Sequence, residues 1–112
     1  MWYRKDVGYA GESVAADYYT QLGFTVVHQN YTIRGWEIDL IIQAPHADIF
    51  VEVKVVQTLD HLHDYITQQK IRILQRTIDF YLLKYPSQKD IQLDVVFIKD
   101  NTIIEVFNGV EL

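Results

Sequence analysis

The sequence predicts an α/β fold in which helices pack on a mixed β-sheet. Apolar residues recur at helical spacing in two segments, one near the N-terminus and one from Asp64 to Tyr85. Short apolar runs with strand periodicity lie between and after these segments, bounded by turn residues. The resulting order is helix, strand, strand, strand, helix, strand, strand. This order requires antiparallel neighbours and one parallel pair joined through the second helix.

The composition is that of one folded domain spanning residues 1–112, because 49% of the residues are hydrophobic and 13% are aromatic. The absence of cysteine excludes disulfides and thiolate metal sites, and it is compatible with a reducing, cytoplasmic location. No apolar run approaches the roughly 18 residues of a membrane span, and no charged-then-apolar leader opens the chain. We therefore expect no membrane partner.

The first helix is expected to start between Gly8 and Gly11 and to end near Leu22, before Gly23 in the C-cap position. Its predicted apolar stripe consists of Val14, Ala15, Tyr18 and Leu22. Glu12 lies at the edge of this stripe. It is either a first-turn acid stabilised by the helix dipole or part of a functional site.

The other elements follow in order. The predicted strands and turns are Phe24 to Val27, a turn at Arg34 to Trp36, and a hairpin from Glu37 to Lys54 that turns at Ala44 to Asp48. A loop from Gln57 to His63 leads to the second helix, with Asp64 as its N-cap or first-turn acid and Pro86 after its end. Ile91 to Lys99 and Ile103 to Phe107 form the last two strands.

The hairpin carries charges inside apolar strands, where they are costly to bury for packing alone. Glu37 and Asp39 share a face of the first strand, and Glu52 and Lys54 share a face of the second. Asp39 and Glu52 offer the oxygen ligands that Mg²⁺ prefers, and the Val53 carbonyl between the charges could complete the shell. Lys54 could orient the attacking water or stabilise developing negative charge. The alternative is a salt-bridged strand pair on a solvated face.

Two further residues could extend this site. Lys70 falls near the middle of the apolar arc of the second helix, between Ile66 and Leu74. It either extends its ammonium to the surface or reaches an acidic site beneath the helix, which we favour. Glu12 could supply another metal ligand. Asp94, in an apolar strand, is expected to pair with a buried cation such as Lys70.

These residues resemble a known group. Asp39 followed by Glu52-Val53-Lys54 resembles the PD-(D/E)xK signature of the restriction-endonuclease-like superfamily, and the whole layout is similar to the YraN-like family, itself similar to archaeal Holliday-junction resolvases. The positions that carry the likeness are Gly11-Glu12, Ala15, Gly23-Phe24, Asn30-Tyr31, Glu37 to Ile41, Phe50 to Lys54, Lys70 and Asp94 to Val96.

The resemblance implies a restriction-endonuclease-like core and a specific division of roles. Glu12, Asp39 and Glu52 would bind Mg²⁺, or Mn²⁺ in its place, Lys54 would be catalytic, and Lys70 would approach from the second helix. The substrate would be DNA, branched or otherwise structured, and symmetric cutting of two strands would require a two-fold homodimer.

The chain departs from the family pattern at three places. Trp36 stands where the family usually has glycine, Val56 replaces an arginine two residues after the catalytic lysine, and Gln92-Leu93-Asp94 replaces an Arg-Phe-Asp run. Arg72 and Arg76 on the exposed helix face either contact phosphates or form a solvated surface. Four aromatic residues either stack on unpaired bases or pack as core and rim aromatics: Tyr3, Tyr9, Tyr31 and Trp36.

The sequence therefore predicts a metal-dependent endonuclease that hydrolyses DNA phosphodiesters. The alternative is a catalytically inactive module on the same fold that binds nucleic acid or a protein, and a third option is a structural subunit. The net charge of −5 favours the inactive module. However, setting aside the four acids Glu12, Glu37, Asp39 and Glu52 leaves −1, and a bound divalent cation would change the local sign.

Overall fold

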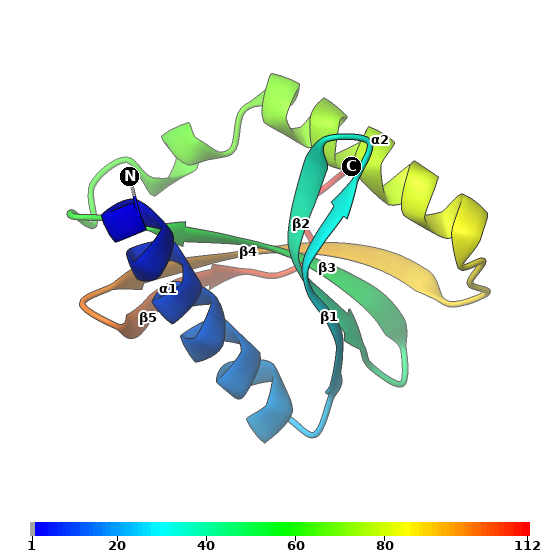
Figure 1. The fold of residues 1–112 in the computed structure, drawn as a ribbon, viewed down its shortest axis with the longest axis horizontal. Helices are drawn as coiled ribbons and strands as arrows, with labels where there is room; N and C mark the ends of the chain where they lie inside the picture. The colour runs from blue at the N-terminus through cyan, green and yellow to red at the C-terminus, as the bar shows by residue number, and fades with distance from the viewer. Residues whose placement is uncertain (1) are drawn as a thin grey trace.

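A computed structural model describes the backbone of residues 2–112 and the side chains of residues 10–112. Its elements are α1 (Trp2–Gln21), β1 (Thr25–Ile33), β2 (Trp36–Gln43), β3 (Ala47–Val55), the 3₁₀ helix η1 (Leu62–Tyr65), α2 (Gln68–Lys84), β4 (Asp90–Lys99) and β5 (Thr102–Phe107). The five strands form one sheet in the order β1-β2-β3-β4-β5 (Figure 1). Only β3 and β4 are parallel. The predicted α/β class and element order are confirmed.

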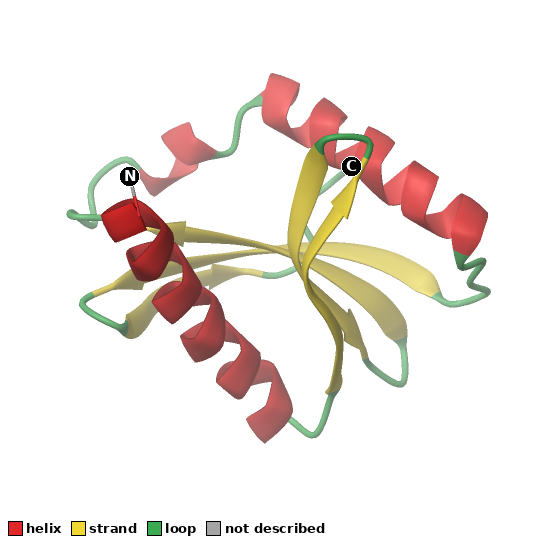
Figure 2. Ribbon diagram, in the orientation of Figure 1, coloured by secondary structure: helices red, strands yellow, loops and turns green. Residues whose placement is uncertain are grey.

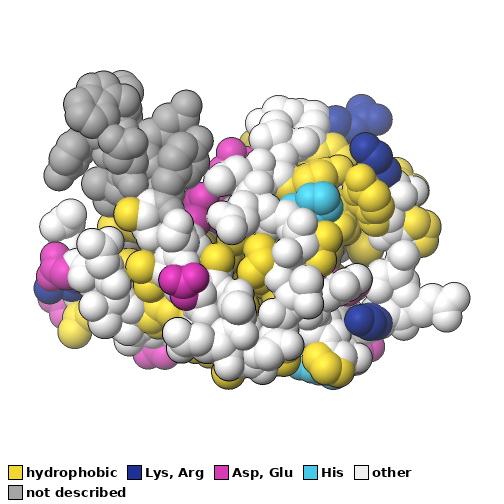
Figure 3. All heavy atoms as spheres, turned by 60° about the horizontal axis from the view of Figure 1, so that its bottom comes forward, with side chains coloured by type: hydrophobic (Ala, Val, Ile, Leu, Met, Phe, Trp, Pro, Cys, Tyr) yellow, Lys and Arg dark blue, Asp and Glu magenta, His cyan; other side chains and the backbone are white. Residues whose placement is uncertain are grey.

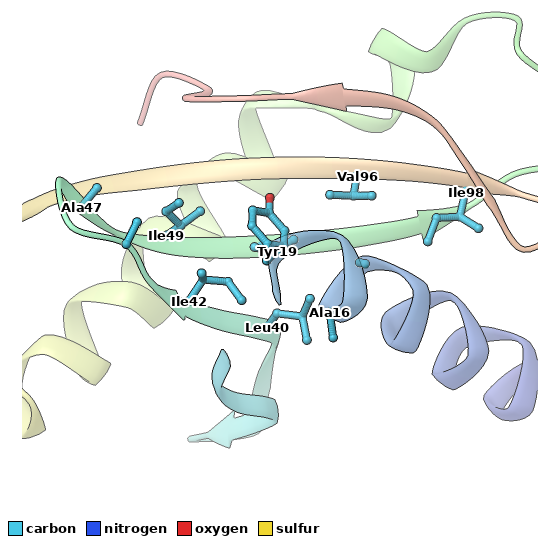
Figure 4. Close-up of a cluster of buried hydrophobic side chains, with 11 residues drawn as sticks. Ala16, Tyr19, Leu40, Ile42, Ala47, Ile49, Val96 and Ile98 are labelled. Atoms are coloured by element: carbon cyan, nitrogen blue, oxygen red, sulfur yellow. The ribbon is translucent and has the colours of Figure 1, made fainter. Parts of the chain in front are cut away.

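The sheet is covered on both sides, by α1 on one face and α2 on the other (Figure 2). Ala15, Ala16 and Tyr19 of α1 pack on apolar residues of β2, β3 and β4 (Figure 4). On the opposite face, Ile78 and Tyr81 of α2 pack on the sheet, against Ile38, Ile41 and Phe50. No helix within residues 2–112 has the length and apolar character needed to cross a membrane.

The first helix differs from the prediction in its start and in its buried stripe. It begins at Trp2, well before Gly8. Leu22 lies after the last helical residue and is 51% exposed, whereas Tyr19 is 1% exposed. The stripe is rotated because the Tyr19 hydroxyl donates a 2.6 Å hydrogen bond to the buried Asp94 carboxylate, a partner that Tyr18 does not have at its position on the helix.

Asp94 does not pair with Lys70, contrary to the prediction. It faces α1, where it accepts hydrogen bonds from the Tyr19 hydroxyl, the Gln92 side-chain amide and the Gly109 backbone N–H. Side chains alternate along β4, and the neighbours Val95 and Phe97 lie in a cluster separate from the one under α1. Lys70 belongs to α2 on the other face, so the sheet lies between the two charges.

The second helix begins later than predicted. Thr67 is its N-cap, and the Thr67 hydroxyl accepts a hydrogen bond from the Lys70 backbone N–H. Asp64 is instead an exposed residue of the 3₁₀ helix η1. The chain leaves helical geometry at Ile66, which has φ −109° and ψ 80° and packs against the cluster containing Val56. Burial of Ile66 therefore separates η1 from α2.

The first strand is longer than the predicted Phe24 to Val27. It runs from Thr25 to Ile33 and pairs with β2 as far as Ile33 opposite Trp36. Only two residues connect the paired ends, and both have positive φ, 52° at Arg34 and 82° at Gly35. These values are typical of the tight type I′ turn of a hairpin. The turn fixes Trp36 at the tip of a stiff β-ribbon.

We expect Tyr19→Phe to destabilise the protein by about 1–3 kcal/mol, because Asp94 would lose one of its donors inside the core. Urea denaturation followed by circular dichroism measures this. Tyr18→Phe is the matched control, since that half-buried neighbour should change stability by no more than about 0.5 kcal/mol. Equal effects of the two substitutions would show that the Tyr19–Asp94 hydrogen bond does not stabilise the fold.

Candidate metal centre at a fork in the sheet

The site lies where β2 and β3 separate. Their pairing runs from Gln43 opposite Asp48 to Leu40 opposite Val51 and ends there. Beyond that point β2 continues beside β1 to Trp36, while β3 continues beside β4 to Val55. Figure 1 shows the β1–β2 hairpin diverging from β3. At the fork, side chains from α1 and from α2 both reach carboxylates of the sheet.

Asp39 occupies the fork at the first position past the last β2–β3 pair. Its Oδ2 accepts a 2.7 Å hydrogen bond from the backbone N–H of Val53. This bond satisfies an amide of β3 that β2 no longer reaches, and it fixes the orientation of the carboxylate. We predicted that the Val53 carbonyl is a metal ligand. This contact involves the Val53 N–H and not the carbonyl, so that role stays a prediction.

Glu12 enters the fork from α1. Glycine at position 11 permits close packing, because an added Cβ would lie 2.8 Å from Cγ2 of Val55. Ligand atoms of Glu12, Glu37 and Asp39 lie within 4.8 Å of one another, and this is the one such group of three or more in the described part of the chain. Since α1 starts at Trp2, Glu12 lies in mid-helix, and the interpretation as a first-turn acid is wrong.

Glu52 lies between two lysines. The Lys54 ammonium is 3.8 Å from its Oε1, and the Lys70 ammonium is 3.8 Å from its Oε2. Lys70 therefore does reach the acidic site beneath α2, as we expected from its position on the helix. Glu52 also lies close enough to Asp39 for that carboxylate to raise the pKa of Glu52. Asp39 is thus common to the Glu12–Glu37 group and to the group of Glu52 and its lysines.

Burial and mutual repulsion set the protonation of this cluster. Glu12, Asp39 and Glu52 are only 7%, 9% and 8% exposed. Burial, and then the Asp39 charge, raise the pKa of Glu12 from an ordinary 4.5 to about 7. The same two causes raise the pKa of Glu52 to about 8, although Lys70 and Lys54 act in the opposite direction. The neighbouring lysines therefore do not supply enough positive charge to keep Glu12 and Glu52 ionised at their ordinary pKa.

Asn30 is a site residue to which the sequence analysis gave no role. Its side chain lies near Glu12 and lowers the pKa of that carboxyl, and its backbone has φ 53° within β1. Oδ1 of Asn30 and Oε1 of Glu12 are both buried and have no hydrogen-bond partner among the described residues. The signal in the sequence was that Asn30-Tyr31 is among the positions that carry the family resemblance, in a segment that follows the predicted strand Phe24 to Val27. An asparagine there indicates a turn as readily as a site.

The donor set suits a hard divalent cation. It consists of carboxylate and amide oxygens without thiolate or imidazole, as Mg²⁺ and Mn²⁺ prefer. Two buried oxygens without partners mark a place where a cation would satisfy them. The structure adds Glu37, to which the sequence analysis gave no metal-binding role, to Glu12 and Asp39, whereas Glu52 falls outside that closest group.

Two of the family departures have structural explanations. The Gln92 amide donates a 2.9 Å hydrogen bond to Asp94, so position 92 serves the buried carboxylate under α1. Val56 is 3% exposed and packs with Val95 and Phe97. In this chain both positions are therefore used for packing or for the Asp94 hydrogen bonds.

Comparison with known proteins places the chain in a family. The model of the uncharacterised protein family UPF0102 matches residues 11–98. The chain belongs to the UPF0102 family. A UPF0102 protein of Campylobacter fetus is 34% identical over 96 residues, which are 86% of either chain. A UPF0102 protein of Nitratiruptor sp. is 35% identical over 102 residues, covering 91% of this chain and 90% of the relative.

The YraN-like resemblance is confirmed by this membership, because YraN and UPF0102 denote the same family. The matched residues include the whole fork, from Glu12 on α1 to Lys70 on α2 and Asp94 on β4. The five-stranded mixed sheet with a helix on each face is consistent with the restriction-endonuclease-like fold. The descriptions of the UPF0102 relatives name no activity, so the function rests on the site itself.

The raised pKa values predict that the metal-free UPF0102 protein loses stability as pH rises. Between about pH 4.5 and 8 the folded state holds protons on Glu12 and Glu52 that the unfolded state releases. This contribution is fully present below pH 4.5 and disappears as pH passes 7 to 8. We expect Glu52→Gln to flatten the decline, measured by denaturation with chelator present.

Glu105→Gln, at an exposed position of β5, is the control and should leave the pH profile unchanged. If wild type and Glu52→Gln lose the same stability between acidic and alkaline buffer, Glu52 does not carry a raised pKa in the folded state.

Proposed function

We propose that this UPF0102 protein is a metal-dependent endonuclease that hydrolyses phosphodiester bonds in DNA. The observation that carries the proposal is the carboxylate cluster at the fork, in which Glu12 and Asp39 are buried, Glu37 is exposed, and Glu12 Oε1 has no hydrogen-bond partner among the described residues. Such a cluster destabilises the fold unless a cation or protons neutralise it. Mutual repulsion of this kind is typical of sites that use their charges for binding or catalysis.

The proposed roles follow from the contacts. Glu12, Glu37 and Asp39 would hold Mg²⁺ or Mn²⁺, with Glu52 beside Asp39 as a further ligand. The cation, when bound, activates water and neutralises charge on the phosphate. The Lys54 side chain is 31% exposed, so it can reach a substrate and orient the attacking water. Lys70, 37% exposed, would hold Glu52 and face the same phosphate.

The substrate and setting are part of the proposal. Phosphodiester hydrolysis is the chemistry that a carboxylate-bound magnesium with adjacent lysines performs well. We infer that the DNA is branched or otherwise structured and that a two-fold dimer would cut two strands symmetrically. A cytoplasmic location is compatible with the absence of cysteine.

A second candidate is a catalytically inactive module on the same fold that binds nucleic acid or a protein. The net charge of −5 favours it, because nucleic-acid binders are usually basic. On the face drawn in Figure 3, Lys and Arg side chains are few and separated by acidic and uncharged ones. In that case the fork would be a relic that no longer binds a metal ion.

Metal titration separates the two candidates. If the site binds, Mn²⁺ should raise the melting temperature of the wild type by several degrees, because a ligand of the native state stabilises it. Glu12→Gln should remove this response while raising the metal-free melting temperature at alkaline pH, where it relieves repulsion with Asp39. A wild type that melts at the same temperature with and without Mn²⁺ would support the inactive module.

Nicking of DNA tests the reaction itself. With Mg²⁺ or Mn²⁺ the wild type should cleave branched DNA, and Lys54→Ala or Asp39→Asn should lower the rate by about 100-fold or more. Lys99→Ala is the matched control for Lys54→Ala, since Lys99 is also a partly exposed strand lysine, paired with Asp100. Cleavage that persists in both site variants would assign the activity to another part of the chain or to a contaminant.

A further inference from the structure

A small hollow lies between the tip of the β1–β2 hairpin and α2. It has a volume of about 180 Å³ and is lined by Trp36, Gln69, Arg72, Ile73 and Arg76. Figure 1 shows the hairpin tip beside α2. The hollow is smaller than the roughly 300 Å³ at which drug-sized ligand pockets begin. Its apolar walls, the Trp36 indole and Ile73, suit one flat aromatic ring.

The backbone of Trp36 is held in place before any ligand arrives. The two-residue turn at Arg34 and Gly35 ties Trp36 to Ile33 across the hairpin. The Arg34 guanidinium lies 4.4 Å from the centre of the Phe80 ring, which attaches the hairpin tip to α2. Trp36 is nevertheless 43% exposed, so much of its indole is not used in packing. An exposed indole on a fixed support favours stacking of a ligand.

The polar rim of the hollow is cationic. Arg72 and Arg76 are exposed and one helical turn apart, and neither forms an ion pair with the side chains of residues 10–112. In a chain of net charge −5, these two guanidinium groups, which have no acidic partner among the side chains of residues 10–112, make a locally cationic surface beside an indole. Guanidinium groups bind phosphate with good geometry. The rim therefore complements an anion that is attached to an aromatic ring.

Two residues that line the hollow are next in the chain to residues of the candidate metal centre. Trp36 precedes Glu37, a member of the closest carboxylate group, and Gln69 precedes Lys70, which contacts Glu52. From Lys70 to Arg76 is six residues of helix, about 9 Å at 1.5 Å per residue. That length corresponds to about two to three nucleotide steps of a duplex strand at 3.4 Å each. A strand with its phosphate at the fork would therefore carry its next nucleotides over this hollow.

We propose that the hollow binds an unpaired nucleobase of the DNA strand whose phosphate enters the fork, with Arg72 and Arg76 on the flanking phosphates. The base must be unpaired, because the faces of paired bases are covered by their stacked neighbours. The inference rests on the proposed nuclease function and refines its substrate. The preferred substrate is DNA with single-stranded character next to the cut, such as a flap, an overhang or an opened junction.

Trp36 itself reports on binding. The chain has two tryptophans, so Trp2→Phe leaves Trp36 as the single tryptophan, whose fluorescence is excited selectively at wavelengths that tyrosine does not absorb. In a chelating buffer that prevents cleavage, a short oligothymidine strand should quench this fluorescence, and a blunt duplex of equal length should not. Poly-glutamate is the polyanion control, since it matches the negative charge and carries no bases.

Substitutions then assign the contacts, with binding measured as anisotropy of a labelled oligothymidine. Trp36→Ala should weaken binding about tenfold, the size expected for one stacked base. Arg72→Ala and Arg76→Ala should each lower the salt slope of binding by about one. Tyr85→Ala and Lys84→Ala are matched controls at the far end of α2, where Tyr85 is 41% exposed, and should have little effect.

The outcomes are distinct. Quenching by oligothymidine but not by poly-glutamate, together with a loss specific to Trp36→Ala, supports the base-binding hollow. Quenching by both polymers, or equal losses in Trp36→Ala and Tyr85→Ala, overturns it. The binding assays need neither metal nor cleavage. If the wild type fails to nick DNA, the proposed nuclease function is contradicted, but the result of the binding assays still stands. Conversely, nicking unaffected by Trp36→Ala would overturn only the hollow.

Discussion

The separation of β2 and β3 after Leu40 and Val51 is the constraint on which the rest of the site depends. Two strands that remained paired would keep Asp39 and Glu52 on one face, beneath α2, and α1 would have no access to them. The fork opens the sheet at this point. Asp39 then compensates for the lost pairing by accepting the Val53 N–H, so the same side chain that satisfies the backbone also presents its carboxylate to the site.

The fork also explains how two helices on opposite faces contribute to one cluster. Glu12 arrives from α1 because Gly11 allows the helix to approach Val55 closely, and Lys70 arrives from the first turn of α2. The cluster stores unfavourable electrostatic energy, visible in the raised pKa values of Glu12 and Glu52. The apolar clusters on the two faces of the sheet offset this cost and hold the carboxylates in place. Charges held together in this way are ready to bind a cation.

Much of the fold was predictable from local patterns. The element order, the hairpin with its charged strands and the position of Lys70 on the second helix follow from periods of two and 3.6 residues. Boundaries were less predictable. Ile66 has the spacing of a helical core residue, yet it packs on Val56 outside α2, and the first helix extends to Trp2. Periodicity records which residues share a face, and it carries little information on where an element starts.

The sequence by itself determined which side chains could form a site: Asp39, Glu52 and Lys54 in apolar strands, with Glu12 and Lys70 on the helices. Only the tertiary structure decided their partners. It placed Glu37 and Asn30 near Glu12, and it paired the Asp94 carboxylate with the Tyr19 hydroxyl on the α1 side of the sheet. The physical reason is that these contacts join residues distant in the chain. They depend on the rotation of α1 and on the point where two strands stop pairing, neither of which a local pattern encodes.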